Sequence, residues 1–448
     1  MQPREERPLR VAMLSEHASP VALLGSVDAG GQNTYVDEVS RRLGQLGLQV
    51  DVFTRRDDPD ASEVIAWAPG VRVVNLAVGP ARFVPKDDLW PLMRAFEREL
   101  LRFAAGEDGR YDVLHGNFWM SGWIAARLRR RLHIPAVQIF HALGKTKQRH
   151  QGDADTSPGD RIEVETSVLK QVDRVIAQCP AERDELIHDY GAAPRAVTMI
   201  PSAVNVRRFR PIAREAARAH IGLPSDGPVV AYIGRMLPRK DPRNIVRAVA
   251  LLANDPGFTA GREITLLCVG GETTDPDPVA TPEIAQLQQL AADLGIGHHM
   301  RIVGKRQPDE LSDYYCAADV VVTTPWYEPF GLTPLEAQAC GRPVIGSAVG
   351  GITFTIADGV TGYLVPPRDP AAVARRLRDL LTQPDLRERM GRAARARVER
   401  EFTWETVGAR TNDLYRTVIA STRGNAHSFQ IPATALITPE LLESTRGA

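Results

Sequence analysis

Two glutamates in the second half of the chain have the residue type and spacing to bind a sugar beside a phosphate. Glu328 and Glu336 are separated by seven residues, with Gly331 between them. A carboxylate accepts hydrogen bonds from two neighbouring hydroxyls, and glycine lets the backbone approach an anion at a helix start, where amide groups point outward. We interpret residues 323–337 as two sugar-binding carboxylates around a phosphate site. The alternative is a pair of exposed acids near a helix end.

A pair of cations follows the first strand expected in the second half. Arg235 and Lys240 lie five residues apart in the loop after residues 229–234. Two positive side chains at the carboxyl end of a strand can neutralise a diphosphate as it departs, and both should be exposed in an empty cleft. A solvated basic loop is the alternative. Arg306 follows another expected strand, residues 301–304, and is a candidate contact for a nucleobase.

The candidates in the first half are a glycine-rich loop and two histidines. Residues 28–33, Asp-Ala-Gly-Gly-Gln-Asn, join an early loop to a helix and could bind an anion through Gly30 and Gly31, or form only a tight turn. His115 and His141 each end an expected strand, at the sheet edge where ligands bind. A structural histidine is the alternative at both positions.

The residues around the two glutamates resemble a known family. The run Glu-Pro-Phe-Gly-Leu-Thr-Pro-Leu-Glu at 328–336 is similar to the E-x7-E motif of the retaining glycosyltransferases of family 4, which have the GT-B fold, and the resemblance covers nearly the whole chain. It implies that Glu336 binds the donor ribose and that Glu328 contacts the donor sugar. The residues implied at the donor phosphate, through backbone amides, are Phe330, Gly331 and Leu332.

The same resemblance assigns donor roles to the other candidates. The G-R-x-x-x-x-K loop implies that Arg235 and Lys240 hold the donor diphosphate. Gly30 and Gly31 are similar to the glycine loop that meets the diphosphate from the opposite wall. Arg306 lies where related enzymes read the base, so we expect a UDP-sugar, with a GDP-sugar as the alternative.

The resemblance also implies an acceptor site on the first half. The segment 141–147 is similar to one in sucrose-type members, in which the histidine, here His141, lies against the donor sugar and the lysine, here Lys147, faces the acceptor. Arg161 begins an R-I-E-x-E helix whose arginine helps to hold an acceptor phosphate, with an ion pair inside the helix as the alternative. The implied acceptor residues are Asn33, Lys86, Lys147 and Arg161.

Two positions depart from the inositol-phosphate members of the family. Phe118 stands where they have tyrosine, and Ala142 stands where they have threonine. Each missing hydroxyl removes a hydrogen bond to a charged phosphate that would be worth about 1.5–3 kcal/mol. We therefore expect an acceptor of the sucrose-phosphate type, such as a hexose phosphate. An unphosphorylated natural product is the alternative acceptor.

The resemblance implies transfer with retention at the anomeric carbon. The acceptor attacks from the face that the diphosphate leaves, and the donor phosphate takes the acceptor's proton. There is no D-x-D element in a metal-ligand setting, so we expect no required metal and no cofactor beyond the nucleotide-sugar donor. The competing hypotheses are a sugar-nucleotide epimerase or phosphorylase on the same fold, and a non-catalytic sugar-binding protein.

Two sheets are needed to bring these residues together. Short β-branched apolar runs alternate with helix-like patterns through the first half, and the alternation restarts in the second half, which is typical of parallel βαβ sheets. We therefore predict an α/β protein with two facing Rossmann-like domains and an inter-domain cleft. The predicted strands are 9–14, 50–54, 71–78, 111–115, 136–141, 174–179 and 197–200, then 229–234, 264–270, 301–304, 320–324, 343–347 and 362–365.

The domain boundaries follow from where the alternation pauses. Residues 205–224 carry arginines and prolines without a strand pattern and are interpreted as the linker. We expect an acceptor domain over 1–205, a nucleotide-sugar domain over 206–403, a helix over 404–425 that packs back on the first domain, and a tail over 426–448. Open α/β sheets bind ligands beyond the carboxyl ends of their strands, so the cleft is the expected active site.

Composition limits the partners. The 55 basic residues balance 55 acidic ones, which argues against nucleic acid as the main partner. The N-terminus lacks the apolar core of a signal peptide and no run of about 18 apolar residues occurs, so we expect a cytoplasmic protein without stable membrane insertion. The oligomeric state stays open. Four widely separated cysteines fit a reducing compartment: Cys179, Cys268, Cys316 and Cys340.

Overall fold

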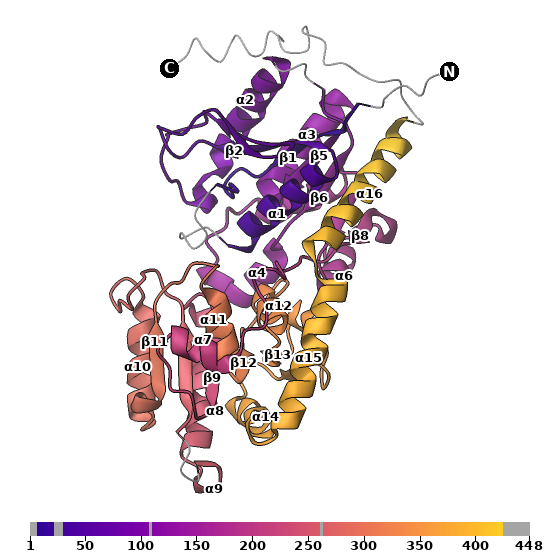
Figure 1. Ribbon diagram of the computed structural model, residues 1–448. Helices are drawn as coiled ribbons and strands as arrows, with labels where there is room; N and C mark the ends of the chain where they lie inside the picture. Colours follow the sequence, from indigo (N-terminus) through magenta and orange to yellow (C-terminus); the bar gives the residue numbers. More distant parts are fainter. Residues whose placement is uncertain (1–6, 22–29, 107–109, 260–262, 424–448) are drawn as a thin grey trace.

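The computed structural model describes residues 7–21, 30–106, 110–259 and 263–423, and these form two α/β lobes, one above the other in Figure 1. Each lobe is built on one sheet with helices on both faces. The predicted fold class is confirmed, because one mainly parallel sheet is formed by β1 to β8, within residues 10–199, and a second by β9 to β14, within residues 229–365. The predicted tail, residues 426–448, lies outside the described residues.

The first sheet has eight strands in the order β3-β4-β2-β1-β5-β6-β7-β8, and neighbours are parallel except for β3 and β4. The strands are β1 (Arg10–Leu14), β2 (Gln49–Arg55), β3 (Val64–Ala68), β4 (Val71–Leu76), β5 (Val113–Asn117), β6 (Ala136–Ile139), β7 (Arg174–Ala177) and β8 (Val197–Met199). The helices of this domain are α1 (Gly31–Gln45), α2 (Met93–Gly106), α3 (Phe118–Leu132), α4 (Gly144–Gln151), α5 (Arg161–Leu169) and α6 (Pro180–His188).

The second sheet has six parallel strands in the order β11-β10-β9-β12-β13-β14. The strands are β9 (Val229–Ile233), β10 (Thr265–Val269), β11 (Met300–Val303), β12 (Val320–Thr323), β13 (Val344–Ser347) and β14 (Gly362–Val365). The helices are α7 (Arg214–His220), α8 (Pro242–Ala253), α9 (Pro256–Thr259), α10 (Pro282–Asp293), α11 (Leu311–Ala317), α12 (Leu332–Ala339), α13 (Ile352–Thr355), α14 (Pro370–Thr382), α15 (Pro384–Glu401) and α16 (Trp404–Arg423).

Short 3₁₀ helices complete the connections. They are η1 (Lys86–Asp88), η2 (Trp90–Leu92), η3 (Gly152–Ala154), η4 (Pro194–Ala196), η5 (Pro238–Lys240) and η6 (Gly297–His299).

The central strands are mostly buried because helices cover both faces of each sheet. All five residues of β9 are buried, and so are the last four of β1. A strand buried on both sides needs a continuous apolar run, which is what made these strands predictable. The helices begin at local signals such as Asp369, whose side chain accepts a hydrogen bond from the amide of Ala372 at 2.8 Å, with Pro370 as the first helical residue.

The last helix, α16, returns to the first domain. It runs from the lower lobe along the upper one (Figure 1), and its residues Trp404, Tyr415 and Val418 join the core that lies under β1 and α1. The chain therefore crosses between the domains twice. The two crossings are bonded to each other, because the amide of Val204 donates to the carbonyl of Phe402 at 3.1 Å.

Three details differ from the sequence prediction. The edge strand β3 was not predicted, since none of its residues is buried and it pairs, antiparallel, with β4 alone. The predicted linker was too long, because α7 packs on α11 and places Ala217 in the core of the second domain. His115 does not end a strand, because β5 continues to Asn117 and pairs with β6 up to that residue.

Candidate functional site

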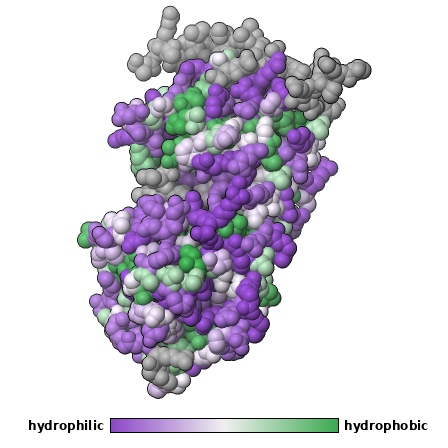
Figure 2. All heavy atoms as spheres, in the orientation of Figure 1, coloured by the Kyte–Doolittle hydropathy of each residue, from purple (hydrophilic) through white to green (hydrophobic). Residues whose placement is uncertain are grey.

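The cleft between the domains contains the residues predicted to bind the donor. A cavity of about 450 Å³ opens there, lined by both domains. Figure 2 shows a largely hydrophilic surface over both lobes, with an indented outline where the lobes meet. The predicted residues that line the cavity are Gly30, Gly31, His141, Arg235, Lys240, Arg306, Glu328, Phe330, Gly331, Leu332 and Glu336.

The order of the second sheet explains why distant segments meet in this cleft. The strand order reverses between β9 and β12, and ligands of such sheets bind outside the carboxyl ends at this point. The loop after β9 carries Arg235 and leads into η5, which ends at Lys240. The loop after β12 carries Glu328 and leads into α12.

Lys240 and Glu328 form an ion pair on the wall of the cleft. Both side chains are only partly exposed, at 19% and 17%. Burial lowers the pKa of Lys240, and the nearby Glu328 carboxylate opposes that shift. The expectation of two exposed cations was therefore right for Arg235 and wrong for Lys240. The ammonium group of Lys240 is already paired with the carboxylate of Glu328, which lies in the loop after β12.

Gly331 allows α12 to start facing the cleft. Its φ of 101° lies in the left-handed region that favours glycine, and a β-carbon there would lie 3.2 Å from Thr355 Oγ1. No side chain caps this helix start, so its first amide groups have no side-chain acceptor. An uncapped helix start on the cleft wall can bind an anion such as phosphate.

Glu336 lies one turn further into α12, at the edge of the same cleft. Its Oε2 accepts a hydrogen bond from the hydroxyl of Tyr315 on α11 at 2.6 Å. Burial raises its pKa, and the bond from Tyr315 opposes the shift. Its carboxylate can therefore bind hydroxyls from a rigid position.

The opposite wall of the cleft is the glycine turn that starts α1. A β-carbon on Gly31 would lie 3.2 Å from Leu332 Cδ1, so the two walls approach closely here. Asp28 and Ala29 of this loop lie outside the described residues. Asn33 does not line the cleft, because its side chain is buried, accepts from the Gly30 amide at 3.0 Å and donates to the Ser19 carbonyl at 3.0 Å. In this structure it stabilises the turn.

His141 follows β6 and extends the first-domain wall. Its φ of 60° is unusual for a residue with a side chain. Burial lowers the pKa of His141 to about 3, and His115 and His17 add to this shift, so the ring is neutral near pH 7. His115 itself is fully buried and bonded to Tyr415, which leaves it a structural role.

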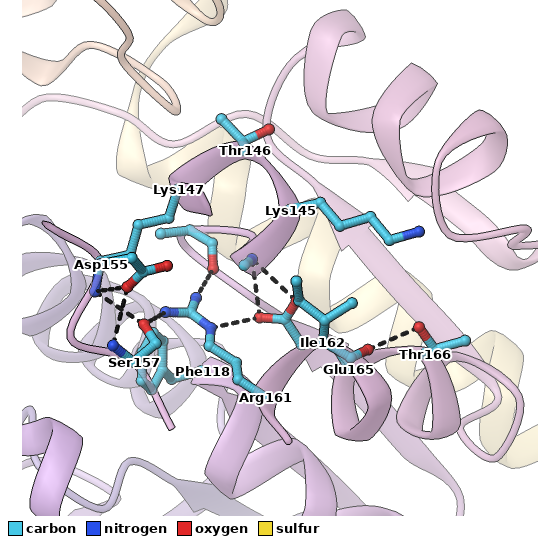
Figure 3. Close-up of polar contacts among 12 residues, drawn as sticks. Phe118, Lys145, Thr146, Lys147, Asp155, Ser157, Arg161, Ile162, Glu165 and Thr166 are labelled. Carbon is cyan, nitrogen blue, oxygen red and sulfur yellow. Dashed lines mark hydrogen bonds and ion pairs between the residues drawn. The ribbon is translucent and has the colours of Figure 1, made fainter. Parts of the chain in front are cut away.

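Two of the residues predicted to bind the acceptor, Lys147 and Arg161, lie near each other but are already partnered (Figure 3). Lys147 Nζ lies 2.9 Å from Asp155 Oδ1 and donates to Ser157 Oγ at 2.9 Å. The Arg161 guanidinium is 2% exposed and donates to Glu165 Oε1 at 2.8 Å and to the Ala142 carbonyl at 2.7 Å.

Arg161 therefore forms an ion pair with Glu165 within its own helix, which is the alternative that the sequence analysis left open. Its guanidinium also lies over the ring of Phe118, 5.0 Å from the ring centre. Lys86 is partly exposed at the start of η1. Of the acceptor candidates, Lys86 and Lys147 keep the accessibility that a ligand contact requires.

A second cavity of about 340 Å³ lies beside the first and shares Glu328 and Pro329 with it. Lys147 contributes to this cavity and not to the first one. Its apolar lining comes from both domains and includes Ala142, Leu143, Trp326, Tyr327, Pro329 and Val349.

Three cations on the cleft wall were missed by the sequence prediction. Arg208, Arg239 and Lys305 all line the first cavity. Arg239 and Lys305 are the immediate neighbours of the predicted residues Lys240 and Arg306, whereas Arg208 lies in the predicted linker and had no such signal. Across the parts of the chain that the structure describes, no helix combines the length and apolar character needed to cross a membrane.

Comparisons with known proteins agree with this geometry. The family model "Glycosyltransferase Family 4" matches residues 29–208, and "Glycosyl transferases group 1" matches residues 213–397. The chain is 38% identical to D-inositol 3-phosphate glycosyltransferase of Streptomyces coelicolor, over 94% of each chain. It is also 38% identical to the protein of that name from Geodermatophilus obscurus, over 97% of this chain and 96% of the relative.

Solved structures show the same likeness. Sucrose-phosphate synthase from Thermosynechococcus elongatus superposes with a TM-score of 0.83 and 34% identity, covering 92% of this chain and 100% of that one. Anabaena HepE, solved with UDP and glucose, has a TM-score of 0.69 and 18% identity, covering 91% and 100%, and shares the fold.

Proposed function

Because the chain belongs to the family 4 glycosyltransferases, with a group 1 glycosyltransferase domain in its second half, we propose that it transfers a sugar from a nucleoside diphosphate sugar to a small hydroxylated acceptor in the inter-domain cleft. The family predicted from the glutamate motif is confirmed, and with it the enzyme class. The observation that carries the proposal is the pairing of Lys240 with Glu328 beside the uncapped start of α12.

The proposed donor runs along the second-domain wall. Glu336 binds the ribose hydroxyls, and the base lies near Arg306. The diphosphate lies between Arg235, Lys240 and the first amides of α12. In this structure Glu328 neutralises Lys240, and the bound donor would replace this pair by giving the cation a phosphate and the carboxylate a sugar hydroxyl.

The proposed chemistry is charge stabilisation on the departing diphosphate. The acceptor hydroxyl attacks from the face that the diphosphate leaves, so configuration is retained, and a phosphate oxygen takes the proton. The two cations and the helix start stabilise the negative charge that grows on the diphosphate. The protein's own cations supply this charge, so the proposal includes no metal and no cofactor.

The donor nucleotide can be tested by thermal stabilisation. We expect UDP to raise the melting temperature more than GDP or ADP, because a ligand at 100 times its Kd adds about 2.7 kcal/mol of stability. The measurement is differential scanning fluorimetry at matched ligand concentrations. The control is Glu336→Ala, in which the shift by the preferred nucleotide should shrink. If none of the three nucleotides shifts the wild-type melting temperature, the proposed donor site is wrong.

The proposed acceptor is a sugar or cyclitol phosphate that approaches from the first domain. The relatives act on inositol 3-phosphate or make sucrose phosphate, according to their names. Lys86 and Lys147 would contact its phosphate. One observation favours an unphosphorylated acceptor instead, namely that Lys147 already has Asp155 as its partner while the adjacent cavity offers apolar groups such as Leu143 and Trp326 beside its charged ones.

A paired assay decides between the two acceptors. With the preferred donor, fructose 6-phosphate and inositol 3-phosphate are compared with fructose and inositol. We expect at least one phosphorylated acceptor to show about a tenfold higher kcat/KM, which corresponds to one contact of about 1.4 kcal/mol. Lys147→Ala should remove that advantage and leave the unphosphorylated substrates unchanged. Equal rates within both pairs would instead support the unphosphorylated acceptor.

A further inference from the structure

A buried asparagine holds the histidine of the cleft. Asn117, the last residue of β5, is completely buried, and its Oδ1 lies 3.1 Å from His141 Nε2. The two residues lie at the carboxyl ends of neighbouring strands, because Asn117 ends β5, which pairs with β6, and His141 follows β6 by two residues. The contact therefore joins the wall of the cleft to the centre of the first sheet.

The orientation of the Asn117 amide follows from its other contacts. Its Nδ2 donates to the carbonyl of Leu14 at 3.2 Å and approaches that of His115 at 3.5 Å. A carbonyl can only accept a hydrogen bond, so the amide nitrogen must face these two atoms. Oδ1 then faces His141 and can only accept, which places the ring proton on Nε2 and leaves Nδ1 unprotonated.

The side chain of Asn117 does not have the role that its location suggests. Asn117 is the residue before the first turn of α3, where asparagine usually accepts a bond from the helix start. Here the side chain makes no capping bond. Its hydrogen-bonding capacity is directed at His141 and at the carbonyls that orient it.

The backbone around this contact is also unusual. His141 has a φ of 60° and Phe118, next to Asn117, has a φ of 77°. Non-glycine residues adopt such values at a cost that surrounding structure must offset, and they cluster at ligand sites. The ring of Tyr35 on α1 packs edge-on against His141, with ring centres 5.0 Å apart. The ring is thus fixed by one hydrogen bond and one aromatic contact.

We propose that Asn117 is a positioning residue, which holds His141 as the neutral tautomer protonated on Nε2 so that Nδ1 can accept a hydrogen bond from a donor-sugar hydroxyl. This inference rests on the proposed function, which places His141 beside the donor sugar. An amide oxygen suits the role because it accepts a hydrogen bond from the ring without stabilising a positive charge on it. A carboxylate would favour the imidazolium, in which both ring nitrogens are donors and neither can accept a hydrogen bond.

The groups that face His141 are consistent with a neutral ring. Tyr35 comes from α1, His115 from β5, and His17 from the loop after β1, where Glu16 Oε1 lies 2.8 Å from His17 Nδ1. Neither His115 nor His17 favours a second positive charge at His141, since both act to lower its pKa.

The test combines a double-mutant cycle with a change of charge. Asn117→Ala should lower kcat roughly 10- to 100-fold, since small misplacements of a contact to the reacting sugar have effects of this size. If Asn117 acts through His141, Asn117→Ala should add almost nothing in a His141→Ala background. Asn75→Ala is the matched control, because it removes another buried first-domain asparagine, bonded to the Ser62 carbonyl, and should keep kcat.

Asn117→Asp tests the proposal through the pH dependence of the rate, which should not change if Asn117 has only a structural role. The carboxylate should raise the pKa of His141, so the rate should fall as pH decreases through that new value, while the wild type shows no such loss. Histidine ¹⁵N NMR should show a proton on Nε2 of His141 in the wild type at all pH values above about 5, and a titrating ring in Asn117→Asp.

Three results separate the outcomes. Equal effects of Asn117→Ala with and without His141 would overturn the inference, and so would an unchanged pH profile in Asn117→Asp. Full activity of His141→Ala would contradict the role of His141 in the proposed function. In that case the NMR tautomer still decides whether Asn117 orients the ring: a proton on Nδ1 would overturn it.

Discussion

Lys240→Ala should lower the rate of sugar transfer by about 100- to 1000-fold, which is the usual cost of removing one charged contact to a departing group. The charge on Lys240 matters most when the diphosphate leaves, so the loss should appear in kcat as well as in kcat/KM. A 100-fold loss corresponds to roughly 2.7 kcal/mol of transition-state stabilisation. Arg235→Ala should have an effect of the same order.

Several controls make this result specific. Circular dichroism should show an unchanged fold, since Arg235 is exposed and Lys240 is partly exposed. Arg389→Ala removes an exposed positive charge from α15 and should keep full activity. EDTA should leave the wild-type rate unchanged, because the proposal includes no metal. Full activity of either cleft variant would remove the diphosphate from the place we assign to it.

The two glutamates should fail in different ways. Glu328→Ala should lower kcat about 100-fold with a small change in the donor KM, because contacts to the reacting sugar strengthen on the way to the transition state. Glu336→Ala should chiefly raise the donor KM, because ribose binding is the same in ground and transition states. Steady-state kinetics with varied donor separates the two effects.

Because Glu328 is the ion-pair partner of Lys240, a further variant, Glu328→Gln, is needed to interpret the loss in Glu328→Ala. Glu328→Gln keeps the size of the side chain and removes the charge that neutralises Lys240. If Glu328 acts only as the partner of Lys240, Glu328→Gln and Glu328→Ala should be equally slow. If it binds sugar hydroxyls as proposed, glutamine should recover part of the rate. A turnover within about twofold of wild type in Glu328→Ala would show that the sugar lies elsewhere.

The donor site was predictable because its residues lie in short segments at strand ends. Glu328, Gly331 and Glu336 lie within nine consecutive positions, and α12, which begins after Gly331 and carries Glu336, follows the buried strand β12. Arg235 and Lys240 lie in one loop in the same way. Their arrival in a single cleft also needs a reversal of the strand order between β9 and β12. The alternation of strands and helices predicts the parallel sheet, whereas the structure shows where the order reverses.

The acceptor side was less predictable because its side chains depend on partners distant in sequence. Arg161 has an i+4 partner, Glu165, which the sequence shows, but its burial depends on Phe118, 43 positions earlier, and on the Ala142 carbonyl. The side chain of Asn33 already bonds within the turn that it stabilises, where its amide nitrogen donates to the carbonyl of Ser19, 14 positions earlier.

The amino-acid order was enough to predict the α/β class, the two sheets and most of the residues that line the cleft, because hydrophobic periodicity and short loop motifs act over a few residues. It could not establish which charged groups would be neutralised or which polar atoms would be fixed. Lys240 with Glu328, His115 with Tyr415 and Asn117 with His141 each join separate elements. Such pairs need the sheets and α16 to be packed together, and burial favours them because an unpaired buried polar group costs about 1–3 kcal/mol.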